Sequence, residues 1–189
     1  MKKALTFKIA AISAILIAVF VAIPLVEAQG ETSYSFTLMG PNVSEAEMSR
    51  PPSHVEAGDL LRLTGSGTFD TTGAVSGGGS FQHIKFDGTV HGKGVWTVKE
   101  FVSFTPYGGP HSGKQGGLLK IIIEATSTWS VHWAETGPEK FIFMFIVSSI
   151  VNAPPGAPAE GCTVWGGPGY VVPLFGIVVS GSTLFHLNE

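Results

Sequence analysis

Apolar residues alternate with polar or very small residues along most of the chain after residue 30. This two-residue period is typical of β-strands that bury one face. In one such segment Leu61, Leu63 and Phe69 share a face with Gly65 and Gly67, while the intervening positions are polar. No segment beyond the N-terminal region shows a sustained 3.6-residue period, so the pattern predicts an all-β domain, an antiparallel barrel or sandwich of about eight strands.

Turn residues divide this pattern into candidate strands. Asp87-Gly88 is the strongest turn signal in the chain and predicts a two-residue hairpin. The consecutive glycines Gly77, Gly78 and Gly79 interrupt a strand, where we expect a bulge or sharp coiling. The expected strands cover residues 34–38, 61–70, 74–86, 89–104, 117–125, 126–134, 141–151, 171–179 and 183–187.

Two strands carry the pattern glycine, any residue, glycine, any residue, aromatic ring. They are the segments that end at Phe69 and at Trp96. Glycines at alternate positions let a strand coil tightly and let a bulky side chain lie across its backbone. Because no helical segment follows either one, packing explains these glycines better than a phosphate-binding loop does.

The segment 141–147 is apolar on both faces. Such a strand needs cover on each side. A barrel interior can cover one face. The other face requires a loop, the Pro-rich segment 153–158, a second subunit or lipid, and the sequence leaves these alternatives open.

The first 28 residues resemble a secretory signal peptide. Three lysines precede an uncharged, almost wholly apolar run, 9–26, and small residues follow it. We therefore expect an N-terminal signal helix with cleavage after Ala28, and a single all-β domain over 29–189. The predicted location is secreted, periplasmic or at the cell surface. The membrane would be reached only through this segment if it stayed uncleaved.

Charge and cysteine content exclude several classes of protein. After residue 28 there are eight Lys/Arg and thirteen Asp/Glu residues, a formal charge of −5, so we expect no nucleic-acid partner. Cys162 is the only cysteine, so the chain has no intrachain disulfide and its stability depends on burial. We expect Cys162 to be a small buried apolar residue.

The residue patterns predict no catalytic residues, no metal site and no cofactor. None of the six histidines has the spacing of a metal-binding motif. His83 and His91 flank the Asp87-Gly88 turn, and a regular two-residue hairpin would point them to opposite faces. Only a shift of register, such as a bulge, would bring them together. Glu124 is expected to face outward, and Asn42-Val43-Ser44 is a glycosylation sequon.

Large rings on the strands and polar residues in two glycine-rich loops are the candidates for ligand binding. The loops cover 107–117 and 153–161, and loops at one end of a barrel commonly determine selectivity. The candidate ligand-binding residues are Phe69, Phe81, Trp96, Tyr107, His111, Phe143 and Trp165, with Lys114 as a further residue to test.

Residues 65–81, 92–96 and 103–107 resemble a group of exported, glycine-rich β proteins of prokaryotes with no assigned function. The resemblance covers about the middle third of the chain and implies no catalytic residues. The glycine-rich strands are also faintly similar to barrels of the calycin and allene-oxide-cyclase type, which implies a barrel and transfers no site.

These observations predict an exported, non-enzymatic β-barrel protein that binds a small apolar ligand. One alternative is a structural or adhesive protein of the cell envelope that self-associates as a homo-oligomer through the strand 141–151. A cyclase- or isomerase-type enzyme and a small outer-membrane barrel are further alternatives. The chain end Leu187-Asn188-Glu189 lacks the terminal aromatic residue of the last class.

Overall fold

The computed structural model describes residues 31–50, 54–131, 134–135, 137–166 and 172–188. The chain divides into the segment Met1–Gly30 and the unit Glu31–Glu189, and the description below concerns the second. The expected signal helix therefore lies outside the described residues. None of the described residues belongs to a helix long and apolar enough to cross a membrane.

The described part of the chain forms eleven strands and is all-β, as predicted. The strands are β1 (Ser33–Glu45), β2 (Leu60–Asp70), β3 (Val75–Ile84), β4 (Val90–Pro106), β5 (Lys114–Gln115), β6 (Gly117–Val131), β7 (Ala134–Glu135), β8 (Glu139–Ser149), β9 (Gly161–Trp165), β10 (Pro173–Phe175) and β11 (Ile177–Asn188). Eight of them are at least five residues long, which agrees with the expected number. The expected strand 117–125 and residues 126–131 of the next expected strand form one long strand, β6.

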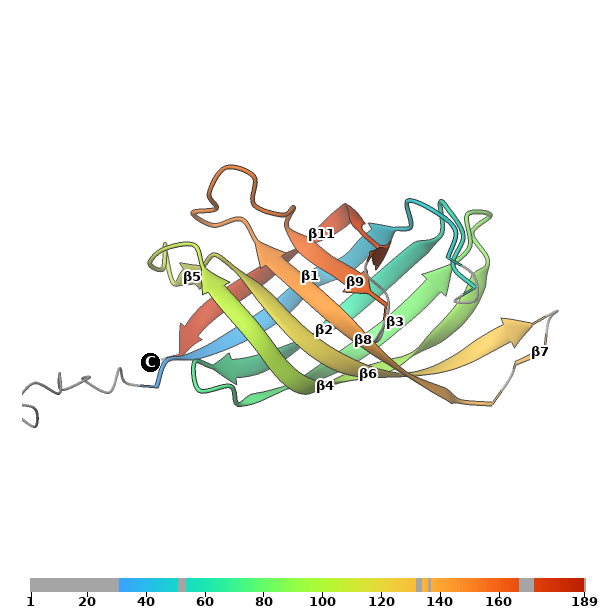
Figure 1. Cartoon of the computed structure of the whole chain (residues 1–189), viewed down its shortest axis with the longest axis horizontal. Helices are drawn as coiled ribbons and strands as arrows, with labels where there is room; N and C mark the ends of the chain where they lie inside the picture. Colours follow the sequence, from blue (N-terminus) through green and yellow to red (C-terminus); the bar gives the residue numbers. More distant parts are fainter. Residues whose placement is uncertain (1–30, 51–53, 132–133, 136, 167–171, 189) are drawn as a thin grey trace, which may run out of the picture. The chain divides into compact units, whose positions relative to one another are not determined.

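The strands belong to one antiparallel sheet in the order β10-β9-β8-β6-β4-β3-β2-β1-β11-β5, with β7 paired to β6. Figure 1 shows that this sheet curls strongly, so that its concave face encloses the core and the strands run obliquely around it. The single curled sheet is barrel-like, and the alternative of two stacked sheets is wrong. The chain returns at its C-terminal end to pair β11 with β1, from Ser33 opposite Asn188 to Glu45 opposite Ile177.

Side chains and short segments connect β9 and β10, at one end of the strand order, with β1 and β11 near the other end. The hydroxyl of Ser44 on β1 donates a hydrogen bond to the carbonyl oxygen of Cys162 on β9. The amide of Gly176, between β10 and β11, donates to the carbonyl oxygen of Glu45 over 3.2 Å. Farther along β11, the short strand β5 pairs with Phe185 and His186. These contacts cover strand edges that would otherwise present unpaired backbone groups.

Glycines create the space in which large rings fill the concave side. A Cβ atom at Gly65 would overlap the indole of Trp96, and one at Gly67 would lie 2.5 Å from Cε1 of Phe36. A Cβ atom at Gly94 would lie 3.0 Å from the ring of Phe81. The predicted use of the paired glycines, to let a bulky side chain lie across the backbone, is confirmed.

Of the two features expected at the glycine triplet 77–79, a bulge or sharp coiling, the bulge is absent. Residues 75–84 of β3 pair with β2 in an unbroken register, from Val75 opposite Phe69 to Ile84 opposite Leu60, so the triplet contains no bulge. The reason is steric. A Cβ atom at Gly77 would lie 2.7 Å from the carbonyl oxygen of Ser66, and one at Gly79 would overlap the carbonyl oxygen of Thr64. Strands β2 and β3 approach too closely there for larger residues.

Strand β8 presents apolar residues on both faces. Phe145 and Val147 point into the core and are 3% and 0% exposed. On the outer face Met144 and Ile146 are half-buried, whereas Ile142 is 42% exposed. Strands β6 and β9 flank this outer face on either side, through the pairs Ile122–Met144 and Met144–Trp165. Lateral neighbours thus cover part of the face, and Ile142 remains on the surface.

Candidate functional site

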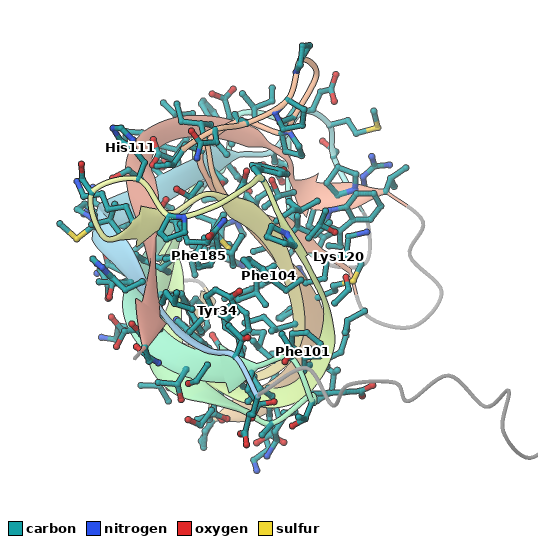
Figure 2. All side chains as sticks on the ribbon, turned by 90° about the vertical axis from the view of Figure 1, so that its left-hand side faces the viewer. Tyr34, Phe101, Phe104, His111, Lys120 and Phe185 are labelled. Atoms are coloured by element: carbon teal, nitrogen blue, oxygen red, sulfur yellow. The ribbon has the colours of Figure 1, made fainter. Side chains whose placement is uncertain are left out.

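Five aromatic rings meet at the end of the curled sheet where β1 begins and β2 ends. The ring of Phe69 is 5.2 Å from that of Tyr34, 4.8 Å from Phe104, and 6.0 Å from both Phe101 and Phe185. Tyr34 also lies 4.9 Å from Phe104. We call these five residues the aromatic end. Figure 2 looks into it and shows Tyr34, Phe101, Phe104 and Phe185 within the ring of strands.

The five rings differ in how far they are buried. Tyr34, Phe69 and Phe185 belong to the core, and Phe101 and Phe104 are only partly buried against it. Beside Phe69 there is an open hollow of about 180 Å³, lined by Ser33, Thr68, Phe69, Asp70, Ala74, Val75 and Ser76. The hollow touches Phe69 but none of the other four rings, and its rim is mostly polar.

Asp70 gives this rim a negative charge. Its Oδ1 atom accepts hydrogen bonds from the hydroxyl and the backbone amide of Thr72, over 2.6 and 2.8 Å, and from the amide of Ala74 over 3.1 Å. The Thr72 hydroxyl is the main reason that the pKa of Asp70 lies below its ordinary value. Asp70 is therefore ionised at neutral pH, and the rim disfavours an anionic group placed next to it.

Phe101 and Phe104 reach the aromatic end because β4 is irregular. Residues three apart on a regular strand point to opposite faces. The pairing of β4 with β6 shifts register between Val98 and Glu100 and again between Phe101 and Ser103. The second shift turns Phe101 and Phe104 to the same side. Sequence reasoning missed both residues because neither irregularity has a glycine or proline signal.

The structure places the predicted ligand-binding residues in several regions. Phe69 lies at the centre of the aromatic end, whereas Phe81 and Trp96 are buried farther along the sheet, over Gly94 and Gly65. Phe143 stacks on Phe141 at 6.0 Å. The others are Tyr107 and His111 on the β4–β6 connection and Trp165 on β9, opposite Met144 and Pro173. The predicted residues do not form one cluster, and of the seven only Phe69 belongs to the aromatic end.

A second cluster, of polar residues, occupies the opposite end of β2. We call it the histidine end and define it as His54, Asp59, His83, Lys85 and His91. Asp59 is 0% and His83 2% exposed. Nε2 of His83 lies 2.8 Å from Oδ2 of Asp59, and Nζ of Lys85 donates to the same oxygen over 3.0 Å. The backbone amide of Glu56 also donates to it, over 2.9 Å.

A bulge brings His91 to this cluster. In the hairpin after β3 the amide of Lys85 donates to the carbonyl oxygen of Thr89 and the amide of Gly88 donates to that of Lys85, each over 2.8 Å, with Gly88 in the left-handed region at φ +87°. The loop therefore has three residues, 86–88, and the prediction of a two-residue hairpin is wrong. His83 then faces Gly92 while Ile84 faces Val90, so His91 is the extra residue of β4. The ring of His91 lies 5.2 Å from that of His83 and 6.0 Å from that of His54. The expectation that His83 and His91 point to opposite faces is therefore wrong.

The environment of the histidine end favours neutral imidazoles and an ionised carboxylate. Burial lowers the pKa of His83, and the hydrogen bond and charge of Asp59 do not offset this effect. Burial also lowers the pKa of His91, with contributions from Lys85 and His54. Burial raises the pKa of Asp59, but hydrogen bonds from Glu56, His83 and Lys85 outweigh it and hold the pKa below its ordinary value.

The aromatic end is suited to binding, and the histidine end is suited to taking up protons. His83 and Asp59 are too deeply buried to meet a substrate. Within the described ranges, no group of three or more His, Cys, Asp or Glu residues could hold a metal ion. Cys162 is fully buried, and burial raises the pKa of its thiol far above the ordinary range, so it is not a nucleophile.

Two other sequence features have a structural explanation. Asn42 of the sequon is 0% exposed, and its side-chain amide donates to the carbonyl oxygen of Ser182 over 3.2 Å, so the folded protein does not present it for glycosylation. Glu124 faces outward, as expected, where Lys99 and Lys140 lie 3.6 and 3.4 Å from its Oε1 atom.

Comparison with known proteins gives no match: no family model matches the chain, and neither the curated proteins nor the solved structures include a significantly similar one.

Proposed function

We propose that this protein is an exported, non-enzymatic binding protein that takes a small, largely apolar ligand at its aromatic end. The observation that carries the proposal is the pair of half-buried rings, Phe101 and Phe104, packed around Phe69. Packing already holds these rings in place, so little side-chain entropy is lost when a flat apolar ligand stacks on them.

Packing confines this binding to the end of the sheet. Trp96 and Phe36 are each 1% exposed and lie over glycines of β2, so the middle of the concave side is filled by the protein's own rings. A ligand there would have to displace them from a close-packed core. The ligand of the aromatic end should be apolar and either uncharged or cationic, because the carboxylate of Asp70 lies at the rim of the neighbouring hollow.

Native mass spectrometry and a fluorescent naphthalene probe test the proposal. We expect stoichiometric binding of uncharged aromatic or aliphatic compounds from a screening panel. Phe101→Gln should weaken the tightest binder at least about fivefold, because it removes about 1 kcal/mol or more of apolar contact. Val102→Gln is the matched control. Val102 is 44% exposed and does not belong to the aromatic end, so this substitution should leave ligand binding unchanged. Equal binding by Phe101→Gln, or no binder in the panel, would contradict the proposal.

Self-association is a second candidate function, favoured by the outer face of β8. Ile142 is 42% exposed on a strand that is also apolar on its inner face. A second copy that covered Ile142, Met144 and Ile146 would complete the burial of this face. Analytical ultracentrifugation tests this idea. A dimer that Ile142→Lys dissociates would support it, whereas a monomer at high micromolar concentration would count against it.

A further inference from the structure

The segment from His54 to Asp59, which precedes β2, is attached to β3 through a small number of side-chain contacts. Lys85 donates through Nζ to the carbonyl oxygen of His54 over 2.8 Å and to Oδ2 of Asp59 over 3.0 Å. His83 contacts the same Oδ2 atom at 2.8 Å. His54 itself has a φ of +60°, a conformation that residues other than glycine seldom adopt. These contacts, together with backbone hydrogen bonds that join Gly58 and Asp59 to Ala46 and Val55 to Arg50, hold a strained segment in place.

Three imidazoles run inward beside this segment. His54 is exposed, His91 is half-buried and His83 is buried, and the consecutive rings are 6.0 and 5.2 Å apart. The bulge in β4 is what completes the row. The row therefore leads from solvent to the buried carboxylate of Asp59.

The charges that face the row come from each neighbouring element. The segment before β2 contributes His54, Glu56 and Asp59. The hairpin after β3 contributes Lys85 and Asp87, and β4 contributes His91 itself. From β10, the apolar ring of Phe175 packs on His83 at 5.5 Å. Lys85 already pairs with Asp59 and Glu56, at 3.0 and 3.5 Å. Protons added to the imidazoles therefore place new positive charges beside an existing one.

We propose that the histidine end is an acid-operated latch, which holds the His54–Asp59 segment against β3 in neutral solution and releases it in mildly acidic solution. Release separates His54 from His91 and Lys85, and it opens His83 to water. It also uncovers Val55 and Phe175, which are 5% and 4% exposed when the latch is closed. The proposal is independent of ligand binding at the aromatic end.

The direction of the pH effect follows from the protonation of the closed state. Burial and neighbouring charges keep the pKa values of His83 and His91 below the ordinary value of 6.5. When the segment leaves β3, both rings become hydrated and regain that value, so release is coupled to proton uptake below about pH 6.5. The pKa of Asp59 is also below its ordinary value of 3.8, so its carboxylate stays ionised throughout this range and is not the trigger.

Hydrogen exchange of the full chain, measured between pH 7.5 and 5.0 and corrected for intrinsic exchange rates, tests the latch. The amides of Glu56, Gly58 and Asp59 are hydrogen-bonded in the closed state. We expect their protection to fall with pH, by up to about tenfold per pH unit for each proton taken up, relative to the amides of Leu119 and Ile121. Constant protection of the segment, or an equal fall in the core amides, would overturn the proposal.

Two variants distinguish a proton-operated latch from a merely structural contact. His91→Phe keeps a ring beside His83 but takes up no proton. His83→Gln keeps a donor for Asp59 and likewise takes up no proton. Each should remain closed at pH 7.5 and lose part of the pH dependence. His186→Gln is the control, because His186 bonds Gly113 at the other end of the sheet. If both variants keep the full pH dependence, the latch is ruled out.

Discussion

The indole ring of Trp96 on β4 lies against the backbone of Gly65 on β2, so closely that a single methyl group at Gly65 would overlap it. The indole nitrogen donates a hydrogen bond to the neighbouring carbonyl oxygen of Thr64 over 3.1 Å. Strand β3 separates β2 from β4 in the sheet. The ring therefore reaches across three strands on the concave side. The absence of a side chain at Gly65 leaves the space for it, and this close packing accompanies the strong curl of the sheet.

Replacing this glycine tests that relationship. Gly65→Ala should lower the free energy of unfolding by about 1–3 kcal/mol, because the added Cβ overlaps the indole and lies 2.5 Å from the carbonyl oxygen of Gly78. Gly109→Ala is the matched control, since no atom lies within 4 Å of a Cβ there. Urea unfolding followed by circular dichroism measures both. Equal stabilities of the two variants would contradict the packing described here.

Ser44 should stabilise the contact between β1 and β9. Its hydroxyl is buried and donates to Cys162, so Ser44→Ala leaves a buried carbonyl oxygen without that partner. We expect a loss of about 1–3 kcal/mol in unfolding free energy. Ser66→Ala changes an exposed serine of β2 and should alter stability by less than about 0.5 kcal/mol. A negligible effect of Ser44→Ala would show that this hydrogen bond does not hold β1 and β9 together.

The thiol of Cys162 should be unreactive while the protein is folded. It is completely buried, and burial raises its pKa, so both the thiolate form and access to reagent are lacking. Treatment with a chromogenic disulfide reagent should label the cysteine only after addition of denaturant. Rapid labelling of the native protein, or a disulfide-linked dimer on a non-reducing gel, would be inconsistent with the structure.

Global stability should decline in two separate ranges as pH falls. His83 and His91 have pKa values below the ordinary 6.5 in the folded state, so the unfolded chain binds more protons below that pH and stability falls. Asp59, Asp70 and Asp87 have pKa values below 3.8, and their contribution is lost only below that value. Glu160 acts in the opposite direction, because burial raises its pKa. Denaturant unfolding at pH 7.5, 6.0 and 5.0 should reveal the first decline, and unchanged stability over this range would refute it.

The sequence contains the strand pattern but not the long-range partners. Strand 61–70 and the role of its glycines were predictable, because alternation and small residues are local signals. The contact of Asp59 with His83 was not, because it depends on a connection folding back onto the sheet. Nor was the convergence of Phe101 and Phe104, which depends on a register shift in β4. Sequence reasoning thus found the core ring Phe69 and missed four of the five residues of the aromatic end.

The most direct test of the proposed binding function is a nuclear magnetic resonance titration with the tightest apolar compound from the screen. The account predicts that shifts concentrate on Tyr34, Phe101, Phe104 and Phe185, while Gly65, Trp96 and His83 stay unchanged. Shifts centred on Trp96, or on Ile142 at the outer face of β8, would place the ligand elsewhere and contradict the assignment of the aromatic end.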